Sequence, residues 1–462
     1  MNPSSNSARP GIFRTLAYDS ADEMLFGHAK YPVECGLGVR VGAGAVIPEV
    51  NYTLEPTSVV PANFPVVLAS YRQMVDDILS RSAKLGLESV VLEFEHLPQL
   101  TENVDLGAQI SAQTKEQMKA YHAGHGLKSA LRATICDIRD VDKPPRMRTG
   151  KHTQTMFDSF RKSAEAGADL LAIESTGGKE VTDKAIVEAD VEALIFGLGV
   201  LAPRDAEFLW NGICDIARAT GTVASGDTAC GFGNTAMVLA DQGFIPVALA
   251  AVIRAMTAVR TLVAHECGAT GPTKDCGYEG PVIKAITGHP ISMEGKSAAC
   301  AHFSHVGNVA AAVCDLWSNE SVQNVRLLAG RAPECFTEIL AYDCRLLNEA
   351  IRTGQAKAMR DMLVNTDKTL SLHAFIICPE VSYEIAKAIV AEDTHFAMTR
   401  AAGLKACELM REAAGAVKVD EREARWLRLA ESALEDMDTE DKVLAEVAPR
   451  FEGVVDLSEY GL

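Results

Sequence analysis

The sequence lacks the signals that would place the protein at a membrane or on nucleic acid. Residues 1–11 are polar and contain no apolar stretch of the kind that a secretory signal needs. The longest apolar run, 245–264, is interrupted by Pro246, Arg254 and Arg260, and an arginine near the centre of a membrane helix costs about 3 kcal/mol. The formal net charge of −18 repels phosphate backbones and anionic lipids. We therefore expect a cytoplasmic protein that binds neither nucleic acid nor membranes.

Patterns typical of disulfide-rich and nucleotide-binding proteins are also absent. The twelve cysteines include no Cys-x-x-Cys pair, and without a secretory signal they do not indicate a disulfide framework. No Gly-x-Gly-x-x-Gly joins a strand to a helix and no Walker A sequence is present, so nucleotide phosphate binding is not indicated. The 462 residues, 48% of them hydrophobic, are enough for one large globular domain and an addition.

From about Pro65 onward, helical segments alternate with short apolar runs that end in a polar residue, which is the pattern of repeated β/α units. The expected helix and strand pairs are 68–86 and 88–95, 114–126 and 127–134, 152–167 and 168–174, 203–221 and 222–227, and a helix ending near 260 with a strand at 262–266. A glycine ends each of the first four helices, where it can adopt the left-handed conformation without steric cost. We predict a (β/α)8 TIM-type barrel with an additional mostly helical layer.

After about Lys296 the pattern is mostly helical. The expected helices are 296–317, 335–352, 357–364, 380–392, 399–414 and 421–436. Further barrel elements should lie in this half, near 324–328 or 374–377. Periodicity alone does not separate such short strands from helix. We divide the chain into a flexible N-terminal extension (1–14), a barrel with N-terminal additions (15–380) and a C-terminal helical segment packed on the barrel (381–462).

Polar residues at the carboxyl ends of the expected strands are the candidates for chemistry, because those ends form the active-site face of a barrel. They are Glu95, His96, Arg132, Thr134, Glu174, Asp227, His265 and Glu266. Two loops each add a cysteine, Cys230 in the glycine-rich turn 226–234 and Cys276 in 271–278. Two cysteines and one acid from successive loops could give a catalytic zinc ion three protein ligands and leave a fourth position open.

These residue types also have structural explanations. Free cysteine is among the most buried residue types, so a loop cysteine is more often a packing residue than a ligand. Three adjacent residues, His265, Glu266 and Cys267, form a rival ligand set. If they lie on a strand, neighbouring side chains point to opposite faces, so at most two of them could bind one metal ion. Glu95 and Asp227 could simply accept hydrogen bonds from the next helix, and we expect Arg132 to pair with a barrel acid.

Long segments dispersed along the chain carry a family resemblance. They include Ile47-Pro48-Glu49-Val50-Asn51-Tyr52, Gly177-Gly178-Lys179-Glu180-Val181, Ser225-Gly226-Asp227-Thr228, Lys274-Asp275-Cys276-Gly277-Tyr278-Glu279 and Trp317-Ser318-Asn319-Glu320-Ser321-Val322. On these segments the chain resembles the zinc-containing catalytic subunits of the methanol:corrinoid methyltransferase family. The likeness covers most of the chain and leaves out the residues before Thr15.

The resemblance implies one zinc ion per chain, held by Glu174, Cys230 and Cys276. It also implies transfer of the methyl group of methanol to the Co(I) corrinoid of a separate corrinoid protein, by a homodimer within a larger complex. One position departs from the pattern of some family members, which carry an acid beside the second ligand where this chain has Ala229.

Methanol is a poor methyl donor because its leaving group is hydroxide, and coordination of its oxygen to zinc removes much of this difficulty. We expect a nearby carboxyl group, Glu95 or Asp227, to manage the alcohol proton. No side chain is nucleophilic enough to accept the methyl group in place of the corrinoid. Three other functions remain open: the same chemistry with another donor such as a methoxylated aromatic, a zinc barrel hydrolase, and a non-catalytic scaffold.

Overall fold

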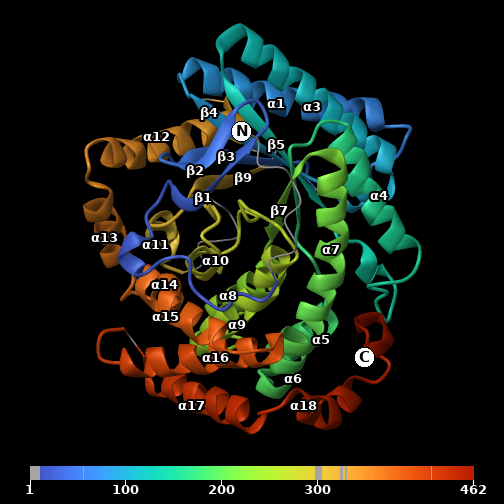
Figure 1. Ribbon diagram of the computed structural model, residues 1–462. Coiled ribbons are helices and arrows are strands. Elements are labelled where there is room, and N and C mark those ends of the chain that lie inside the picture. The colour runs from blue at the N-terminus through green and yellow to red at the C-terminus, as the bar shows by residue number, and fades with distance from the viewer. Residues whose placement is uncertain (1–10, 56, 297–303, 323–325, 328–329, 418) are drawn as a thin grey trace.

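The computed structural model describes residues 11–55, 57–296, 304–322, 326–327, 330–417 and 419–462. Its centre is a curled sheet of seven parallel strands in the order β7-β6-β5-β4-β3-β9-β8 (Figure 1). The strands are β3 (Ile47–Thr53), β4 (Ser89–Glu95), β5 (Lys128–Ile135), β6 (Leu170–Ile173), β7 (Val223–Asp227), β8 (Ser292–Glu294) and β9 (Leu316–Val322). Because β9 pairs with β3 and β8 pairs with the other edge of β9, the order around the sheet follows the order in the chain, as in a TIM-type barrel.

Helices surround the sheet and join its strands. They are α1 (Phe64–Lys84), α2 (Pro98–Glu102), α3 (Val104–His125), α4 (Lys151–Glu165), α5 (Lys179–Glu188), α6 (Val191–Ile195), α7 (Ala202–Thr220), α8 (Thr235–Asp241), α9 (Val247–Glu266), α10 (Gly280–Thr287), α11 (Gly307–Ala311), α12 (Ala332–Arg352) and α13 (Ala356–Asp367). The residues expected to end four helices, Gly86, Gly126, Gly167 and Gly221, all have positive φ and follow α1, α3, α4 and α7. The predicted barrel with extra helices is therefore the observed architecture.

The described residues contain no regular strand between β7 and β8. Residues 269–275 run through this gap instead: the backbone N–H of Thr270 donates to the carbonyl of Ala224 in β7 at 3.0 Å. The hydroxyl of Ser225 and the guanidinium of Arg132 both donate to the carbonyl of Pro272. This irregular segment leads directly to Cys276, so it carries one of the candidate ligands to the barrel.

An antiparallel hairpin covers the N-terminal end of the barrel. It consists of β1 (His28–Cys35) and β2 (Val39–Ala43). Its buried side chains pack with inward-facing residues of five barrel strands, namely Ile47, Val91, Ala130, Leu170 and Leu316. The turn approaches β5 so closely that a Cβ on Gly36, which has a φ of +57°, would lie 2.4 Å from the carbonyl oxygen of Ser129. Because the hairpin closes this end, the carboxyl ends of the strands form the accessible face.

A second group of helices packs outside the barrel. It consists of α14 (Leu372–Ile377), α15 (Pro379–Val390), α16 (His395–Glu412), α17 (Glu421–Asp436) and α18 (Glu440–Glu446). Both α16 and α17 contact α9, which lies between them and the sheet (Figure 1). By length and composition α9 could cross a membrane, but 94% of its apolar stretch is buried in the protein. It is therefore a core helix.

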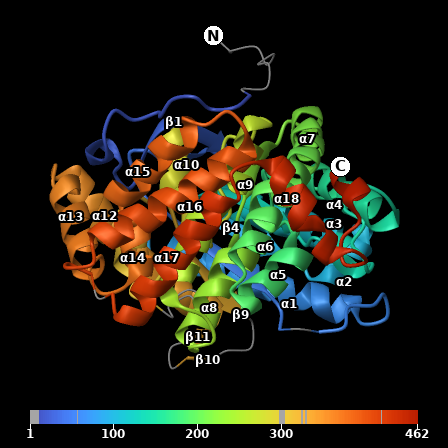
Figure 2. The ribbon, with the colours of Figure 1, turned by 90° about the horizontal axis from the view of Figure 1, so that it is seen from below.

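The C-terminal residues pack against loops at the carboxyl ends of the strands, and the C-terminus lies near α4 (Figure 2). The carboxylate of Glu459 accepts hydrogen bonds from the backbone N–H groups of Arg148 and Thr149 at 2.7 and 2.9 Å. The hydroxyl of Tyr460 donates to Oε1 of Glu180 at 2.6 Å and accepts from the backbone N–H of Gly178 at 2.9 Å. These contacts hold the loops that follow β5 and β6.

Several expected elements are wrong. Residues 262–266, expected to be a strand, form the last turns of α9. This helix is buried on all sides, so its apolar residues do not show the one-sided 3.6-residue period that marks a surface helix. Residues 374–377 belong to helix α14 rather than to the barrel.

The region 296–328 also differs from the expectation of one long helix and a strand. A short helix, α11, is followed by the barrel strand β9, which begins at Leu316. Of the expected strand at 324–328, only 326–327 are described, and they form β10 (Arg326–Leu327), which pairs with β11 (Gly330–Arg331) outside the barrel. The expected helices at 335–352, 357–364, 380–392, 399–414 and 421–436 correspond to α12, α13, α15, α16 and α17. Most of the expected extension, 1–10, lies outside the described residues.

Candidate metal centre

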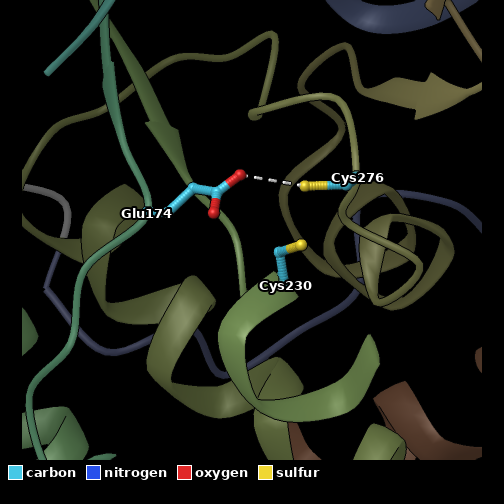
Figure 3. Close-up of side chains that lie close together, drawn as sticks. All are labelled: Glu174, Cys230 and Cys276. Atoms are coloured by element: carbon cyan, nitrogen blue, oxygen red, sulfur yellow. Dashed lines mark hydrogen bonds between the residues drawn. The ribbon is translucent and has the colours of Figure 1, made fainter. Parts of the chain in front are cut away.

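The three candidate ligands lie together at the carboxyl ends of the strands. Glu174 directly follows β6, Cys230 begins the turn after β7, and Cys276 ends the irregular segment that fills the barrel gap. One donor atom of each residue lies within 4.8 Å of the donor atoms of the other two. The thiol of Cys276 is 3.2 Å from Oε1 of Glu174, and all three side chains point toward one another (Figure 3).

The chemistry of this donor set fits a zinc ion. Two sulfurs and one carboxylate oxygen make up a ligand set that zinc accepts in catalytic sites with three protein ligands. The hydrogen bond with Cys276 lowers the pKa of Cys230, but burial and the charge of Glu174 raise it more, to about 11. Its hydrogen bond with Cys230, together with burial, likewise raises the pKa of Cys276. A divalent cation reverses this balance because it stabilises thiolates directly.

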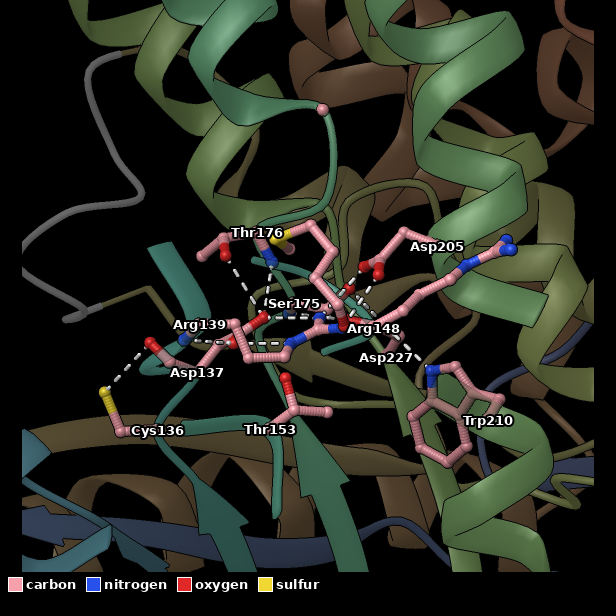
Figure 4. A network of polar contacts seen from close by, with 12 residues as sticks. Cys136, Asp137, Arg139, Arg148, Thr153, Ser175, Thr176, Asp205, Trp210 and Asp227 are labelled. Atoms are coloured by element: carbon pink, nitrogen blue, oxygen red, sulfur yellow. Dashed lines mark hydrogen bonds and ion pairs between the residues drawn. The ribbon is translucent and has the colours of Figure 1, made fainter. Parts of the chain in front are cut away.

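The residues after Glu174 are anchored by two buried carboxylates. The backbone N–H and hydroxyl of Ser175 donate to Asp227 at 3.1 and 2.6 Å. The backbone N–H and hydroxyl of Thr176 donate to Oδ2 of Asp137 at 2.9 and 3.1 Å (Figure 4). Because both residues that follow Glu174 are fixed in this way, the loop holds the backbone of Glu174 in one place.

Arg139 holds Asp137 in turn. The guanidinium group forms paired hydrogen bonds with Asp137, at 2.9 and 2.8 Å, and with Asp205, at 2.7 and 2.9 Å. All three side chains are essentially unexposed. Paired bonds between arginine and carboxylate are among the strongest and most directional in proteins, so this group forms a rigid support beneath the Glu174 loop.

Asp227, one of the two expected proton-handling groups, is already saturated with donors. Besides Ser175, its carboxylate accepts from the backbone N–H of Thr228 at 2.8 Å and the indole of Trp210 at 2.9 Å. Nη2 of Arg260 lies 3.3 Å from its Oδ2. The side chain is fully buried. These contacts suit a residue that positions the Glu174 and Cys230 loops.

The turn that carries Cys230 is held from both sides. The amide nitrogen of Asn234 donates to Sγ of Cys230 at 3.4 Å, and Nη2 of Arg254 donates to the amide oxygen of Asn234 at 2.5 Å. On the other side, the backbone N–H of Ala229 donates to Oε1 of Glu279 at 2.7 Å. The carboxylate of Glu279 thus contacts the backbone of Ala229, the residue before Cys230, although the side chain of Ala229 is only a methyl group.

The ammonium group of Lys274 lies among four carboxylates of the site. Its side chain is 2% exposed, and its Nζ lies 2.6 Å from Asp275, 3.1 Å from Glu93 and 3.9 Å from Glu95. It also lies 3.3 Å from Oε1 of Glu174. Burial alone would lower the pKa of Lys274, but Asp275 and Glu93 raise it well above its ordinary value. The ammonium is therefore charged throughout the physiological range.

Glu95, the other expected proton-handling group, lies at the edge of this cluster. Oε2 of Glu95 accepts a hydrogen bond from the amide of Asn51 at 2.8 Å, and the side chain keeps 29% of its surface exposed. Burial raises the pKa of Glu95, against the lowering effect of Lys274. Glu95 thus combines access to the barrel opening with a carboxyl group that favours its neutral form.

The rival ligand set does not form a site. His265 is 2.9 Å from His289, Nδ1 to Nδ1, while Glu266 bonds to His395 at 2.6 Å and the thiol of Cys267 faces the carbonyl of Glu207. The three side chains therefore point to different partners. The expected pairing of Arg132 with a barrel acid is confirmed, since its Nε donates to Glu49 at 2.7 Å.

Sequence reasoning missed the residues that support the ligands, including Lys274, Glu93, Asn234 and Arg254. Two signals were available. Glu93 and Glu95 are two residues apart on one strand, so both point to the same side of it. Lys274 stands two residues before a candidate ligand.

The chain is similar to proteins of known activity along nearly its whole length. Residues 11–461 match the sequence model of the methanol–cobalamin methyltransferase B subunit family. The methanol–corrinoid protein co-methyltransferase of Methanosarcina barkeri (strain Fusaro / DSM 804) is 38% identical over 449 residues, which span 96% of this chain and 97% of that protein. The crystal structure of the methanol:cobalamin methyltransferase complex from Methanosarcina barkeri matches with a TM-score of 0.94 and 37% identity, covering 98% of this chain and 100% of that one.

Proposed function

The chain belongs to the methanol–cobalamin methyltransferase B subunit family, and we propose that Glu174, Cys230 and Cys276 bind the zinc ion on which its methyl transfer depends. The enzyme transfers the methyl group of methanol to a corrinoid protein. The observation that carries the zinc proposal is the convergence of one carboxylate and two thiols, from three separate loops, within 4.8 Å. When bound, zinc supplies the Lewis acidity that makes the hydroxyl of a small alcohol a better leaving group.

The balance of the reaction requires one proton at the departing oxygen. The carbon–oxygen bond of methanol breaks, the methyl group bonds to the cobalt of the reduced Co(I) corrinoid, and the oxygen leaves as water after taking a proton. We assign the delivery of this proton to Glu95, because its partly exposed carboxyl group lies beside the ligand cluster. Asp227 has no free acceptor position for this task and instead holds Ser175, next to Glu174.

The closed N-terminal end of the barrel determines how the reactants approach. The hairpin β1–β2 fills that end, so methanol and the corrinoid reach Glu174 and Cys276 from the carboxyl ends of the strands. The corrinoid protein would then dock over this opening and exclude water during the transfer, which limits side reactions.

The decisive test is to offer different methyl donors. The protein is mixed with its reduced corrinoid partner, and conversion of Co(I) to methyl-Co(III) is followed by absorbance with methanol, ethanol, methylamines or a methoxybenzoate. We expect fast methylation with methanol alone. Turnover with a methoxyarene only would keep the zinc site and overturn the substrate. Bound zinc without any turnover would favour a hydrolase or a scaffold.

Assembly and location are also part of the proposal. We propose a cytoplasmic homodimer that binds two corrinoid protein subunits, on the basis of the family resemblance. Analytical ultracentrifugation of the isolated chain should give one species of twice the monomer mass. A monodisperse monomer would contradict the dimer, while leaving the catalytic proposal intact.

A further inference from the structure

Lys274 stands between one candidate zinc ligand and the other carboxylates of the barrel. Its ammonium lies 3.3 Å from Oε1 of Glu174 and 3.1 Å from Oε1 of Glu93. The same oxygen of Glu174 accepts the hydrogen bond from Cys276. The cation therefore touches the ligand cluster directly, on the side that faces the barrel interior.

We propose that Lys274 is a positioning residue for the metal centre, which holds the Glu174 carboxylate where it can bind zinc together with Cys230 and Cys276. This inference rests on the zinc site proposed above. It adds a residue that contributes no ligand atom and acts only through Glu174.

The charges of the site explain why a cation is needed there. Zinc brings two positive charges, whereas one carboxylate and two thiolates bring three negative ones, so the occupied site carries one excess negative charge. Lys274 balances this charge from a position where water cannot, since its side chain is 2% exposed. Uncompensated charges in such surroundings are strongly destabilising.

Asp275, the residue after Lys274, connects the Lys274 ammonium to a second candidate ligand, Cys276. Oδ1 of Asp275 accepts from Nζ of Lys274 at 2.6 Å and from the backbone N–H of Cys276 at 2.9 Å. Its Oδ2 accepts from the hydroxyl of Ser318 in β9 at 2.9 Å. The cation and Cys276 are thereby fixed to the same carboxylate, which is itself fixed to the barrel wall.

Without the ammonium, Glu174, Glu93 and Asp275 would face one another with no charge between them. Like charges this close repel one another strongly in a buried site, where water does not screen them. Glu174 is the most exposed of the three, with 33% of its side chain accessible, so it is the group free to turn away. Such a turn would remove one of the three zinc ligands and leave both cysteines in place.

The test compares Lys274→Met with Lys284→Met in the full-length protein. Lys284 is a matched control because it is equally buried and paired with Asp315, at 2.9 Å, just before β9 begins. Zinc affinity is measured by competition with a chromophoric chelator, and the cobalt-substituted protein is examined by absorption spectroscopy. We expect Lys274→Met to bind zinc roughly 10- to 100-fold more weakly, with an altered cobalt spectrum that keeps its thiolate-to-cobalt band. Lys284→Met should keep the native affinity and spectrum.

A second variant keeps the test valid if Lys274→Met fails to fold. In Lys274→Met/Glu93→Gln, the lysine is removed together with one of the acids it neutralises, so the buried charge is lower than in Lys274→Met. We expect it to fold, by circular dichroism, and still to bind zinc weakly, because Glu174 remains unsupported. Native affinity in either folded Lys274 variant overturns the inference. If the native protein binds no zinc, the metal assignment itself fails, and this inference fails with it.

Discussion

The thiol of Cys276 lies 3.2 Å from Oε1 of Glu174, although 102 residues separate them in the chain. No short metal-binding motif brings the two together. Their proximity comes from the barrel, which places the ends of its strands and the segment that fills its gap on one face. Because Cys230 and Cys276 are not among the residues of the packed hydrophobic clusters that form the barrel core, ligand loss and loss of folding can be separated by experiment.

Replacing both cysteine ligands should remove the metal and leave the fold. In Cys230→Ala/Cys276→Ala only one of three protein ligands remains, which is too few for stable zinc binding. Elemental analysis should give one zinc per native chain and almost none in the double variant, with an unchanged circular dichroism spectrum. Cys335→Ala, outside the cluster, serves as the control. Full zinc retention in the double variant would remove the assignment.

Glu95→Gln should slow methyl transfer without affecting the metal. Loss of a general acid typically lowers a rate by roughly 10²- to 10⁴-fold, and glutamine can keep the hydrogen bond from Asn51. The rate is that of methyl-Co(III) formation at saturating methanol, with zinc content measured on the same sample. Glu88→Gln is the matched control, because Glu88 stands just before the same strand but is 82% exposed. A native rate in Glu95→Gln would assign the proton to another group.

Asp227→Asn separates a positioning role from a catalytic one. The amide that replaces one carboxylate oxygen meets donors from Ser175, Trp210 and Arg260, and breaking a buried ion pair costs about 3–5 kcal/mol. We expect a loss of this order in urea unfolding, together with weaker zinc binding. A folded variant with native stability and full zinc, but with a greatly reduced rate, would instead make Asp227 the proton donor.

Much of the fold could be predicted because its β/α units are punctuated by glycines with positive φ, such as Gly126 and Gly221. The two main errors have different physical origins. Helix α9 is apolar on every face, so it lacks the period that distinguishes helix from strand. Strand β9 is not a continuous apolar run, because its Ser318 faces the polar interior of the barrel and bonds to Asp275. A search for apolar runs cannot find such a strand.

The ligands themselves could be nominated from the sequence, because an acid or cysteine directly after a barrel strand faces the opening. Their supports were harder to nominate. Lys274 stands two residues before a ligand, but lysine is rarely buried, and the carboxylates that surround its ammonium, Glu93 and Glu174, come from strands far away in the chain. The saturation of Asp227 is equally invisible, because its donors are spread from Ser175 to Arg260.

The burial of Glu180 should make stability depend on pH in an unusual direction. Burial raises the pKa of Glu180 from 4.5 to about 7, although the Tyr460 hydroxyl lowers it somewhat. The folded protein therefore binds this proton more tightly than the unfolded chain does. Between these two pKa values the unfolded state has released the proton and the folded state keeps it, so the contribution of Glu180 to stability falls as the pH rises.

The size of this loss of stability follows from the difference between the two pKa values. Each pKa unit corresponds to 1.36 kcal/mol, so the native protein should lose up to about 3 kcal/mol more than Glu180→Gln when urea unfolding is compared at pH 5 and pH 8. Glu188→Gln, in the same helix α5 but exposed, should behave like the native protein. Equal pH dependence in the native protein and in Glu180→Gln would show that this carboxyl group is ionised in the folded state at both pH values.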